Sequence, residues 1–449
     1  EAKDVYTFTL RDNARWSDGN QVTAHDFVYA WRRLADPATA SPYSWFAEIM
    51  ALENVGAVMS GESPPEALGI RALDNLTLEV RLTASLPYFA AMTTHASTYP
   101  TPQWTVKTFG DDWTKPGNIV GNGAYVLTEH IPNETATRER NSLYWNNDAT
   151  IIDKVVTLIM NDENTDFTRW EAGETDRGAI PSGQYPRLKA QYPEEAISFP
   201  RLCTYYYTFN LSPSGQDALQ DVRVRQALSY ALDRSVVTDK ILQGGQIQAF
   251  TFTPGATAGF EVPAVAFGQM TQDERNAKAK ELMAEAGYGP DNPLSVEVMY
   301  NTSEGHKKIA IAVQQMWKET LGVKATLANQ EWKTFLKTRG GQNFDIARGG
   351  WCGDYNEAST FLDLLTTPSG YNDGKFSNAE VDELMTSART MSDATSNYTR
   401  VEEILANEMP VIPVYHYTGV FMLRKNVKGW PFNNVEQNIY SRDLYKVAD

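Results

Sequence analysis

Cysteine is scarce in this chain. Only two cysteines, Cys203 and Cys352, occur among 449 residues, and they lie far apart in the sequence. This spacing excludes a Cys-x-x-Cys redox or zinc motif. The residues alone leave two alternatives open: a pair of free buried thiols, or a disulfide, which persists only if the protein is exported to an oxidising compartment.

Long apolar runs are absent as well. No stretch of 18 or more apolar residues occurs, so no segment is predicted to span a membrane. No secretory signal peptide is recognisable, and the sequence opens at once on D-V-Y-T-F-T-L-R-D, a strand pattern already under way. We therefore expect the sequence to lack an N-terminal portion together with any export signal.

Positive charge is in deficit. The chain has 40 lysines and arginines against 56 aspartates and glutamates, which gives a net charge of −16. No basic stripe is available to neutralise phosphates, so nucleic acid is excluded as a partner. A surface this strongly charged favours a soluble monomer.

Catalytic motifs are missing too. The sequence has no G-x-S-x-G, no H-E-x-x-H and no G-x-x-x-x-G-K, and no cluster suggests a metal or a cofactor. Tryptophans and carboxylates are numerous, so a glycosidase with a carboxylate pair across a cleft stays open on composition alone.

The length and the residue patterns indicate a multidomain α/β protein. A chain of 449 residues is too long for one ordinary core, so two or three domains are expected. Apolar alternation and helical periodicity place the elements. Strands are predicted at 5–10, 76–82, 155–160, 204–210, 294–300, 344–347 and 411–417. Helices are predicted from Thr23, as N-cap of a capping box with Asp26, and at 87–92, 165–173, 221–234, 272–286, 306–321, 378–388 and 399–408.

The stretch 339–357 carries groups that suit a zwitterion. The strand at 344–347 is predicted to end at Arg348-Gly349-Gly350, where glycine lets a ligand approach the backbone. Trp351 offers an apolar wall, and the Asp354 carboxylate can accept hydrogen bonds from an ammonium group. Arg339 and Arg348 are planar forks suited to a carboxylate. The competing interpretation is an ordinary Gly-Gly turn with arginines on a solvated surface.

The segment G-W-C-G-D-Y-N-E closely resembles the ligand-binding segment of periplasmic oligopeptide-binding proteins, the soluble receptors of ABC peptide importers. Further blocks that are similar to this family cover nearly the whole chain. They read W-S-D-G-N-Q-V-T-A-H-D-F-V-Y-A-W, D-V-R-V-R-Q-A-L, N-T-S-E-G-H-K-K and N-Q-E-W-K-T-F-L. The resemblance implies an α/β, two-lobed periplasmic-binding-protein fold with an extra domain, in which a hinge joins the lobes that enclose the ligand.

The resemblance also implies domain limits and a cysteine pairing. The extra domain would span 1–102 and be incomplete at its N-terminus, lobe 1 would comprise 103–202 and 419–449, and lobe 2 would span 203–418 and carry most ligand contacts. In the family a disulfide joins the cysteine of L-C-T-Y-Y-Y to that of G-W-C, which implies a bond between Cys203 and Cys352.

The site residues follow from the same resemblance. It implies that Asp354 holds the α-amino group of a peptide, with the Tyr43 hydroxyl nearby. Arg339, Arg348 and His306 would be alternative cationic anchors for the carboxylate of peptides of different length. The site would also be lined by Trp332, Trp351, Gly350, Cys352, Tyr206 and Tyr417. Where many members place a lysine, this chain is expected to have Glu274, which would weaken the capture of one ligand length.

The implied function is a binding protein rather than an enzyme. It would capture short peptides of roughly two to five residues in the periplasm and deliver them to an inner-membrane ABC permease. The alternative within the same fold is a murein-derived or other specialised peptide, a sugar or a metal chelate. Asp354, as a partner for an amino group, argues against a sugar.

Overall fold

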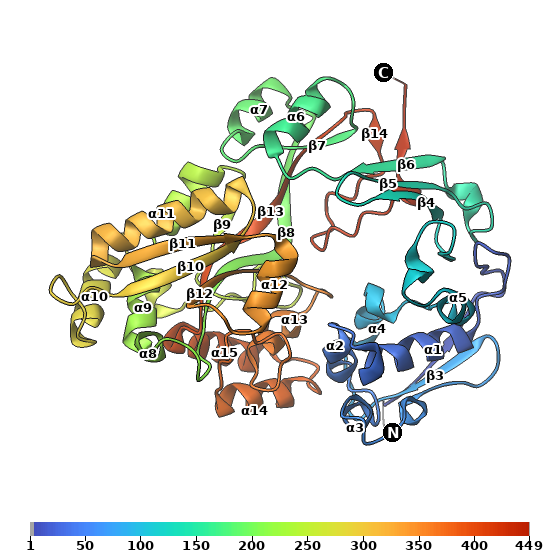
Figure 1. Ribbon diagram of the computed structural model, residues 1–449, viewed down its shortest axis with the longest axis horizontal. Coiled ribbons are helices and arrows are strands. Elements are labelled where there is room, and N and C mark those ends of the chain that lie inside the picture. The colour runs from blue at the N-terminus through green and yellow to red at the C-terminus, as the bar shows by residue number, and fades with distance from the viewer. Residues whose placement is uncertain (1–3, 449) are drawn as a thin grey trace.

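The computed structural model describes residues 4–448 and confirms an α/β architecture (Figure 1). Within that range the strands form four sheets: two three-stranded sheets, a two-stranded ribbon and one seven-stranded sheet. The chain begins in the N-terminal body, passes through the second three-stranded sheet, builds most of the large sheet and then returns to the middle section.

The N-terminal section is a small antiparallel sheet covered by helices. β1 (Val5–Thr9), β3 (Thr77–Arg81) and β2 (Ile70–Ala72) lie in the order β1-β3-β2. Helix α1 (Ala24–Ala35) starts as predicted, because the Thr23 N–H donates to the Asp26 carboxylate at 2.8 Å. Three short helices complete the section: α2 (Ser44–Ile49), α3 (Val55–Met59) and α4 (Phe89–Met92).

The middle section contains the second three-stranded sheet. After α5 (Gln103–Phe109), β4 (Tyr125–Ile131), β5 (Thr135–Arg140) and β6 (Lys154–Leu158) pair antiparallel in sequence order. The chain then forms α6 (Glu163–Glu171), β7 (Arg177–Ala179) and α7 (Tyr185–Gln191). The C-terminal strands β14 (Val427–Lys428) and β15 (Tyr445–Lys446) return to this section, as Figure 1 shows at the top.

The large sheet has the order β11-β10-β12-β8-β13-β7, with β9 (Ile247–Gln248) paired to β13. Its long strands are β8 (Ala196–Phe209), β10 (Ser295–Asn301), β11 (Lys324–Gln330), β12 (Ile346–Cys352) and β13 (Val411–Leu423). The helices are α8 (Asp217–Gln220), α9 (Val222–Tyr230), α10 (Gln272–Glu285), α11 (Glu304–Leu321), α12 (Trp332–Gly340), α13 (Ser359–Leu362), α14 (Ala379–Ala388) and α15 (Thr395–Glu408).

Two strands connect the middle section to the body of the large sheet. β8 and β13 are antiparallel partners of 14 and 13 residues. Their far ends pair at Ala196–Met422 next to β7, and their near ends pair at Thr208–Val411 (Figure 1). The pairing is irregular on both sides of Tyr415–His416. A bend between the two lobes at this position would break the fewest hydrogen bonds between the strands.

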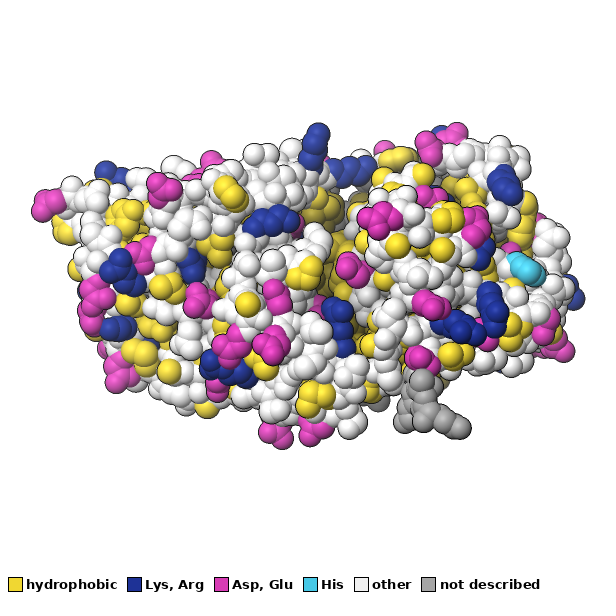
Figure 2. Space-filling view, turned by 90° about the horizontal axis from the view of Figure 1, so that it is seen from below, with side chains coloured by type: hydrophobic (Ala, Val, Ile, Leu, Met, Phe, Trp, Pro, Cys, Tyr) yellow, Lys and Arg dark blue, Asp and Glu magenta, His cyan; other side chains and the backbone are white. Residues whose placement is uncertain are grey.

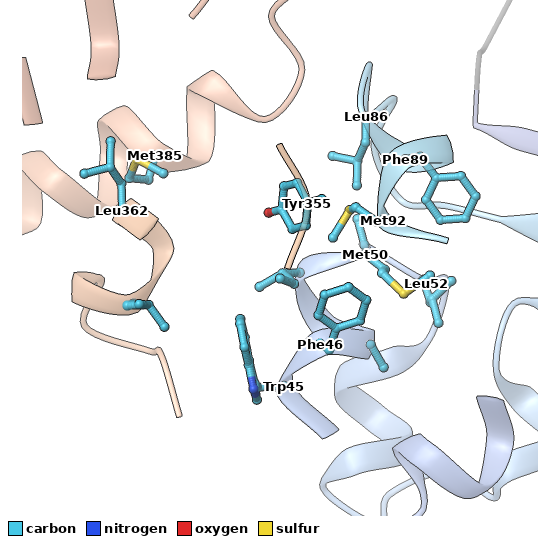
Figure 3. Packing of buried hydrophobic residues seen from close by; sticks show 14 of the residues in the cluster. Trp45, Phe46, Met50, Leu52, Leu86, Phe89, Met92, Tyr355, Leu362 and Met385 are labelled. Atoms are coloured by element: carbon cyan, nitrogen blue, oxygen red, sulfur yellow. The ribbon is translucent and has the colours of Figure 1, made fainter. Parts of the chain in front are cut away.

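The N-terminal section packs directly on the C-terminal helices of the large body. One continuous apolar cluster joins Phe46 and Met92 of the N-terminal section to Phe361 and Met385 of the large body. Tyr355, which is 1% exposed, lies between the two parts in Figure 3 and stacks on Tyr88 at a ring distance of 5.5 Å. The two bodies are therefore held by a buried apolar contact.

Most predicted elements are present, and several differ in extent: β8 begins at Ala196 and β13 continues to Leu423, beyond the predicted 204–210 and 411–417. The strand predicted at 344–347 was expected to end at Arg348, but β12 continues to Cys352 in register with β8. The glycines there are strand residues rather than a turn. Position 349 has no room for a side chain, because a Cβ on Gly349 would overlap the Tyr206 ring. The helix predicted at 221–234 ends at Tyr230. The buried guanidinium of Arg234 instead donates to the carbonyls of Ala249 and Pro413 as part of the scaffold.

The helices of residues 4–448 include none that is long and apolar enough to cross a membrane.

Candidate functional site

Strand β12 has a free edge over its second half. β10 pairs with it only at Val298–Ile346 and Met299–Ala347, whereas β8 pairs with its whole length on the other side. Beyond Ala347, no strand of the described chain occupies the edge that β10 leaves. An extended segment could add there as a further strand, using main-chain hydrogen bonds that any sequence can make.

Asp354 lies just beyond the end of this edge. Its side chain is 10% exposed, and the hydroxyl of Tyr43 donates to it from 3.1 Å to each carboxylate oxygen. Burial raises the pKa of Asp354 to about 7, and the hydrogen bond from Tyr43 lowers it only in part. Among residues 4–448 no lysine or arginine lies within 4.0 Å of the carboxylate, so its charge lacks a cationic side chain as partner.

His95 is the second neighbour of Asp354. Its Nε2 lies 3.4 Å from Asp354 Oδ1, while its Nδ1 accepts from the Ser97 N–H at 3.3 Å and lies 2.8 Å from the Ser97 hydroxyl. An N–H can only donate, so Nδ1 is the acceptor and the ring proton is on Nε2, facing Asp354. Burial lowers the pKa of His95, so the ring is a neutral donor and not a counter-charge. Nothing in the sequence predicts His95 as a site residue, because a lone histidine in a polar loop carries no local signal.

An aromatic cluster lies beside the Asp354 carboxylate and contacts it through Tyr43. The ring of Tyr371 lies 5.7 Å from Tyr43, 5.0 Å from Trp45 and 5.4 Å from Trp351, measured between centroids. The buried indole N–H of Trp351 has no hydrogen-bond partner within the described chain. An ammonium group beside Asp354 would lie among ring faces that favour cations.

Arg348 is the cationic counterpart on β12. It is 8% exposed, and its Nη2 donates to the Tyr417 hydroxyl at 2.6 Å. Its Nη1 lies 3.4 Å from Asn301 Oδ1, and its Cζ lies 4.9 Å from the centre of the Tyr205 ring. No carboxylate of residues 4–448 lies within 4.0 Å of this guanidinium. The site thus brings Arg348 and Tyr417 together, both of which the sequence resemblance implied.

His306 lies near Arg348 but does not carry the expected charge. Its ring is 5.6 Å from the Tyr205 ring at the start of α11. Burial and the neighbouring Arg348 lower the pKa of His306 to about 3. The imidazole is therefore neutral at pH 7 and offers a hydrogen bond, and the role of His306 as an anchor for the peptide carboxylate stays a prediction.

Arg339 is already paired within the protein. Its Nε lies 2.6 Å from Asp373 Oδ2, and its Nη1 donates to the Arg348 carbonyl at 3.3 Å. Burial raises the pKa of Asp373 despite this ion pair, which means that the desolvation of the carboxylate outweighs the attraction. Asp373 thus already pairs with Arg339 within the protein, and the role of Arg339 as an anchor for the peptide carboxylate stays a prediction.

The remaining predicted residues lie in different surroundings. Tyr206 is half-buried against Phe252, at a ring distance of 5.0 Å, and Gly350 lies beside Arg348 and the Tyr417 hydroxyl. Trp332 is 47% exposed and stacks on Phe335. Glu274 forms the capping box of α10 with Thr271, which gives it a structural role at a helix start.

The cysteine pairing is confirmed. Cys203 and Cys352 face each other across β8 and β12 and form a disulfide with a Cα–Cα distance of 4.0 Å. The bond fixes the end of β12 two residues before Asp354. It thereby limits the movement of the Asp354 backbone relative to β8.

The sequence matches the family model described as bacterial extracellular solute-binding proteins, family 5, over residues 1–373. The chain belongs to this family. It is 44% identical over 447 residues to the periplasmic murein peptide-binding protein MppA of Escherichia coli, which covers 99% of this chain and 82% of that protein. It is 42% identical over 452 residues to the periplasmic oligopeptide-binding protein OppA of Salmonella typhimurium, covering 99% of this chain and 83% of the relative.

Solved structures of family 5 members agree with the fold. The structure of the E. coli murein tripeptide binding protein MppA superposes with a TM-score of 0.96 at 43% identity, covering all of this chain and 88% of that one. Haemophilus influenzae OppA in complex with the peptide RPPGFSPFR gives a TM-score of 0.93 at 39% identity, covering 99% of this chain and 88% of that one. A two-lobed periplasmic-binding-protein fold is therefore confirmed.

The lobes adopt an arrangement different from the open form of a relative. The structure of MppA described as its unliganded open form gives a TM-score of only 0.72, at the same 43% identity. The two MppA structures share one sequence, so the difference from 0.96 reflects the placement of the lobes. The contact of Tyr355 with the N-terminal section belongs to this more closed arrangement.

Ligand chemistry is not uniform across these relatives. One of them, 37% identical over 443 residues, is named a probable deoxycholate-binding periplasmic protein of E. coli. Membership in family 5 therefore does not by itself determine the class of ligand, which depends on the residues of the site.

Proposed function

We propose that this protein captures short peptides in the periplasm and delivers them to an ABC importer. The observation that carries the proposal is a pair of opposite, unneutralised charges at the two ends of a free strand edge. Asp354 lacks a cationic side chain, Arg348 lacks a carboxylate, and the open edge of β12 lies between them. A peptide supplies an ammonium, a carboxylate and a strand backbone in this arrangement.

The spacing of the two charged residues suits a short ligand. Asp354 and Arg348 are six positions apart, which corresponds to at most roughly 20 Å of extended chain. The Arg348 side chain shortens that span. Peptides of roughly two to five residues are therefore the expected ligands, at about 3.3 Å per residue.

Lobe closure would complete the site. Tyr43 and His95 reach Asp354 from the N-terminal section, and Arg348 comes from the large sheet. We place the domain limits at 1–102, at 103–202 with 419–449, and at 203–418, since β8 and β13 cross between sections near residues 202 and 418. The protein would act as a monomer and recognise its permease through both lobes once closed.

Calorimetric titration of Ala-Ala-Ala, its N-acetyl form and its C-terminal amide into wild type and Asp354→Asn tests the proposal. Removing one side of a buried charge pair costs about 3–5 kcal/mol, which is roughly two to three decades in affinity. Acetylation should cause a similar loss in wild type and much less in the variant, because both changes delete the same contact. Asp291→Asn, at an exposed carboxylate, is the control. Additive losses would rule out direct contact between Asp354 and the ammonium.

A steroid carboxylate is the second candidate ligand, because one relative is named a probable deoxycholate-binding periplasmic protein. Deoxycholate could pair with Arg348 but has no ammonium for Asp354. If it bound more tightly than Ala-Ala-Ala, and equally well to wild type and Asp354→Asn, the peptide assignment would fail.

We also infer that the protein performs no catalysis on its ligand, in keeping with a family of solute-binding proteins. Mass spectrometry after prolonged incubation should recover bound peptides intact. Cleaved or modified peptide would contradict this.

A further inference from the structure

A second arginine without a carboxylate partner lies near Arg348 on the large sheet. Arg201 is in β8, where the pairing with β13 is irregular: residues 201–203 face the single residue Tyr417, between the pairs Thr204–His416 and Pro200–Thr418. The Nε of Arg201 is buried and has no hydrogen-bond partner within residues 4–448. No carboxylate of the described chain lies within 4.0 Å of its guanidinium.

Arg201 and Arg348 flank the same phenol. Arg348 donates to the Tyr417 hydroxyl at 2.6 Å. Burial lowers the pKa of Arg201, and the nearby Tyr417 partly offsets that effect. Arg201 and Arg348 therefore have the same tyrosine side chain as a neighbour.

A third arginine adds to the positive charge. The Cζ of Arg177 lies 4.7 Å from the centre of the Phe421 ring. Repulsion from the positive charge of Arg201 helps to lower the pKa of Arg177. The charge of Asp166 raises the pKa of Arg177 in part. Asp166 forms no ion pair with either arginine, and one of its oxygens is buried without a partner. Arg177 is exposed to solvent, so the positive charge that lacks an internal carboxylate near the site is that of Arg201 and Arg348.

The Nε of Arg201 is buried without a partner, which is costly, and a single ligand carboxylate at Arg348 would leave Arg201 uncompensated. We infer that Arg201 is a specificity-determining residue that selects peptides with a second carboxylate, an acidic side chain at or next to the C-terminal residue. This inference rests on the proposed function. The C-terminal carboxylate binds Arg348, and the side-chain carboxylate binds the fork of Arg201.

The test compares peptides that differ only in one carboxylate. Ala-Ala-Glu and Ala-Glu-Ala are titrated against Ala-Ala-Gln and Ala-Gln-Ala in wild type, Arg201→Gln and Arg201→Lys. Arg187→Gln, at an exposed arginine of α7, is the matched control. A charge-assisted hydrogen bond predicts that wild type prefers one acidic peptide over its amide by about tenfold to a hundredfold. Arg201→Gln should abolish this ratio and change the affinity for the amide peptide by less than about threefold.

Three outcomes would overturn the inference. Wild type could bind acidic and amide peptides equally, a result that needs no variant to fold. Arg201→Gln could weaken both peptides by the same factor, which would mean that Arg201 holds the terminal carboxylate or the fold. Arg187→Gln could reduce the ratio as much as Arg201→Gln, which would indicate a long-range effect of net charge. If no peptide of either kind binds wild type, the proposed function itself fails, and that result is distinct from tight binding without discrimination.

Discussion

The hydroxyl of Tyr43 lies 3.1 Å from both carboxylate oxygens of Asp354, although 311 residues separate the two in the sequence. Tyr43 belongs to the N-terminal section and Asp354 to the large body, so the contact crosses between them. The carboxylate proposed to hold the peptide ammonium thus also accepts a hydrogen bond that joins the two parts. Binding and closure would be coupled at one side chain.

Peptide affinity should depend on pH through Asp354. Its pKa of about 7 means that protonation competes with the ammonium ligand below neutrality. The peptide α-amino group loses its charge above roughly pH 8. Affinity for Ala-Ala-Ala should therefore peak between about pH 7 and 8 and fall by up to tenfold per unit on the acid side. Calorimetry from pH 5 to 9 measures the profile, and in Asp354→Asn the affinity should no longer fall below pH 7. If the affinity of the variant fell as in wild type, another titrating group would be responsible for that fall.

The same shift predicts a stability effect in the absence of ligand. A raised carboxyl pKa means that the folded protein binds the proton more tightly than the unfolded chain between about pH 4 and 7. Stability contributed by Asp354 is thus present at low pH and lost as the pH rises through about 7. Asp354→Asn should raise the free energy of unfolding at pH 8 by up to about 4 kcal/mol and much less at pH 4. Equal effects at both pH values would contradict the pKa shift.

Arg348 and Arg339 should respond differently to substitution. Arg348→Gln should cost Ala-Ala-Ala roughly two to three decades in affinity and its C-terminal amide far less, because the guanidinium has no internal carboxylate partner.

Arg339→Gln should instead lower stability by about 3 kcal/mol, since it leaves Asp373 buried and unpaired. Adding Asp373→Asn should restore much of that loss. If Arg339→Gln reduced affinity for some lengths between dipeptide and pentapeptide far more than for others, Arg339 would be a direct anchor after all.

The disulfide should stabilise the fold beside the site. It closes a loop of 149 residues, and the chain-entropy model gives at most about 5 kcal/mol for such a loop. Unreduced, denatured protein should show no reactive thiol. The double variant Cys203→Ser, Cys352→Ser should unfold at lower denaturant concentration. Detection of two thiols in the untreated protein would disprove the bond.

Tyr355 should control the balance between closed and open forms. Its ring is buried between the N-terminal section and the large body, and truncation of such a residue costs about 3–5 kcal/mol. Tyr355→Ala should enlarge the radius of gyration in solution scattering and weaken peptide binding. Tyr355→Phe keeps the ring and loses only the hydroxyl contact to Ser359 at 2.9 Å, so it should stay close to wild type. Equal radii for all three proteins would show that other contacts hold the lobes.

Local patterns in the sequence determined much of this protein. The capping box at Thr23, the alternation in β1 and β3, and the periodicity of α9 are short-range properties that residues nearby in the chain establish by themselves. The motif around Asp354 and the pairing of Cys203 with Cys352 were accessible through the family resemblance.

Only the tertiary structure decided the charge state and the partners of the site residues. Asp373 neutralises Arg339, burial beside Arg348 removes the proton of His306, and His95 reaches Asp354 from a distant loop. These properties depend on desolvation and on contacts between residues far apart in the chain, which no local pattern encodes. The free edge of β12 arises in the same way. It exists because β10 diverges after Met299, and that depends on the packing of the whole sheet.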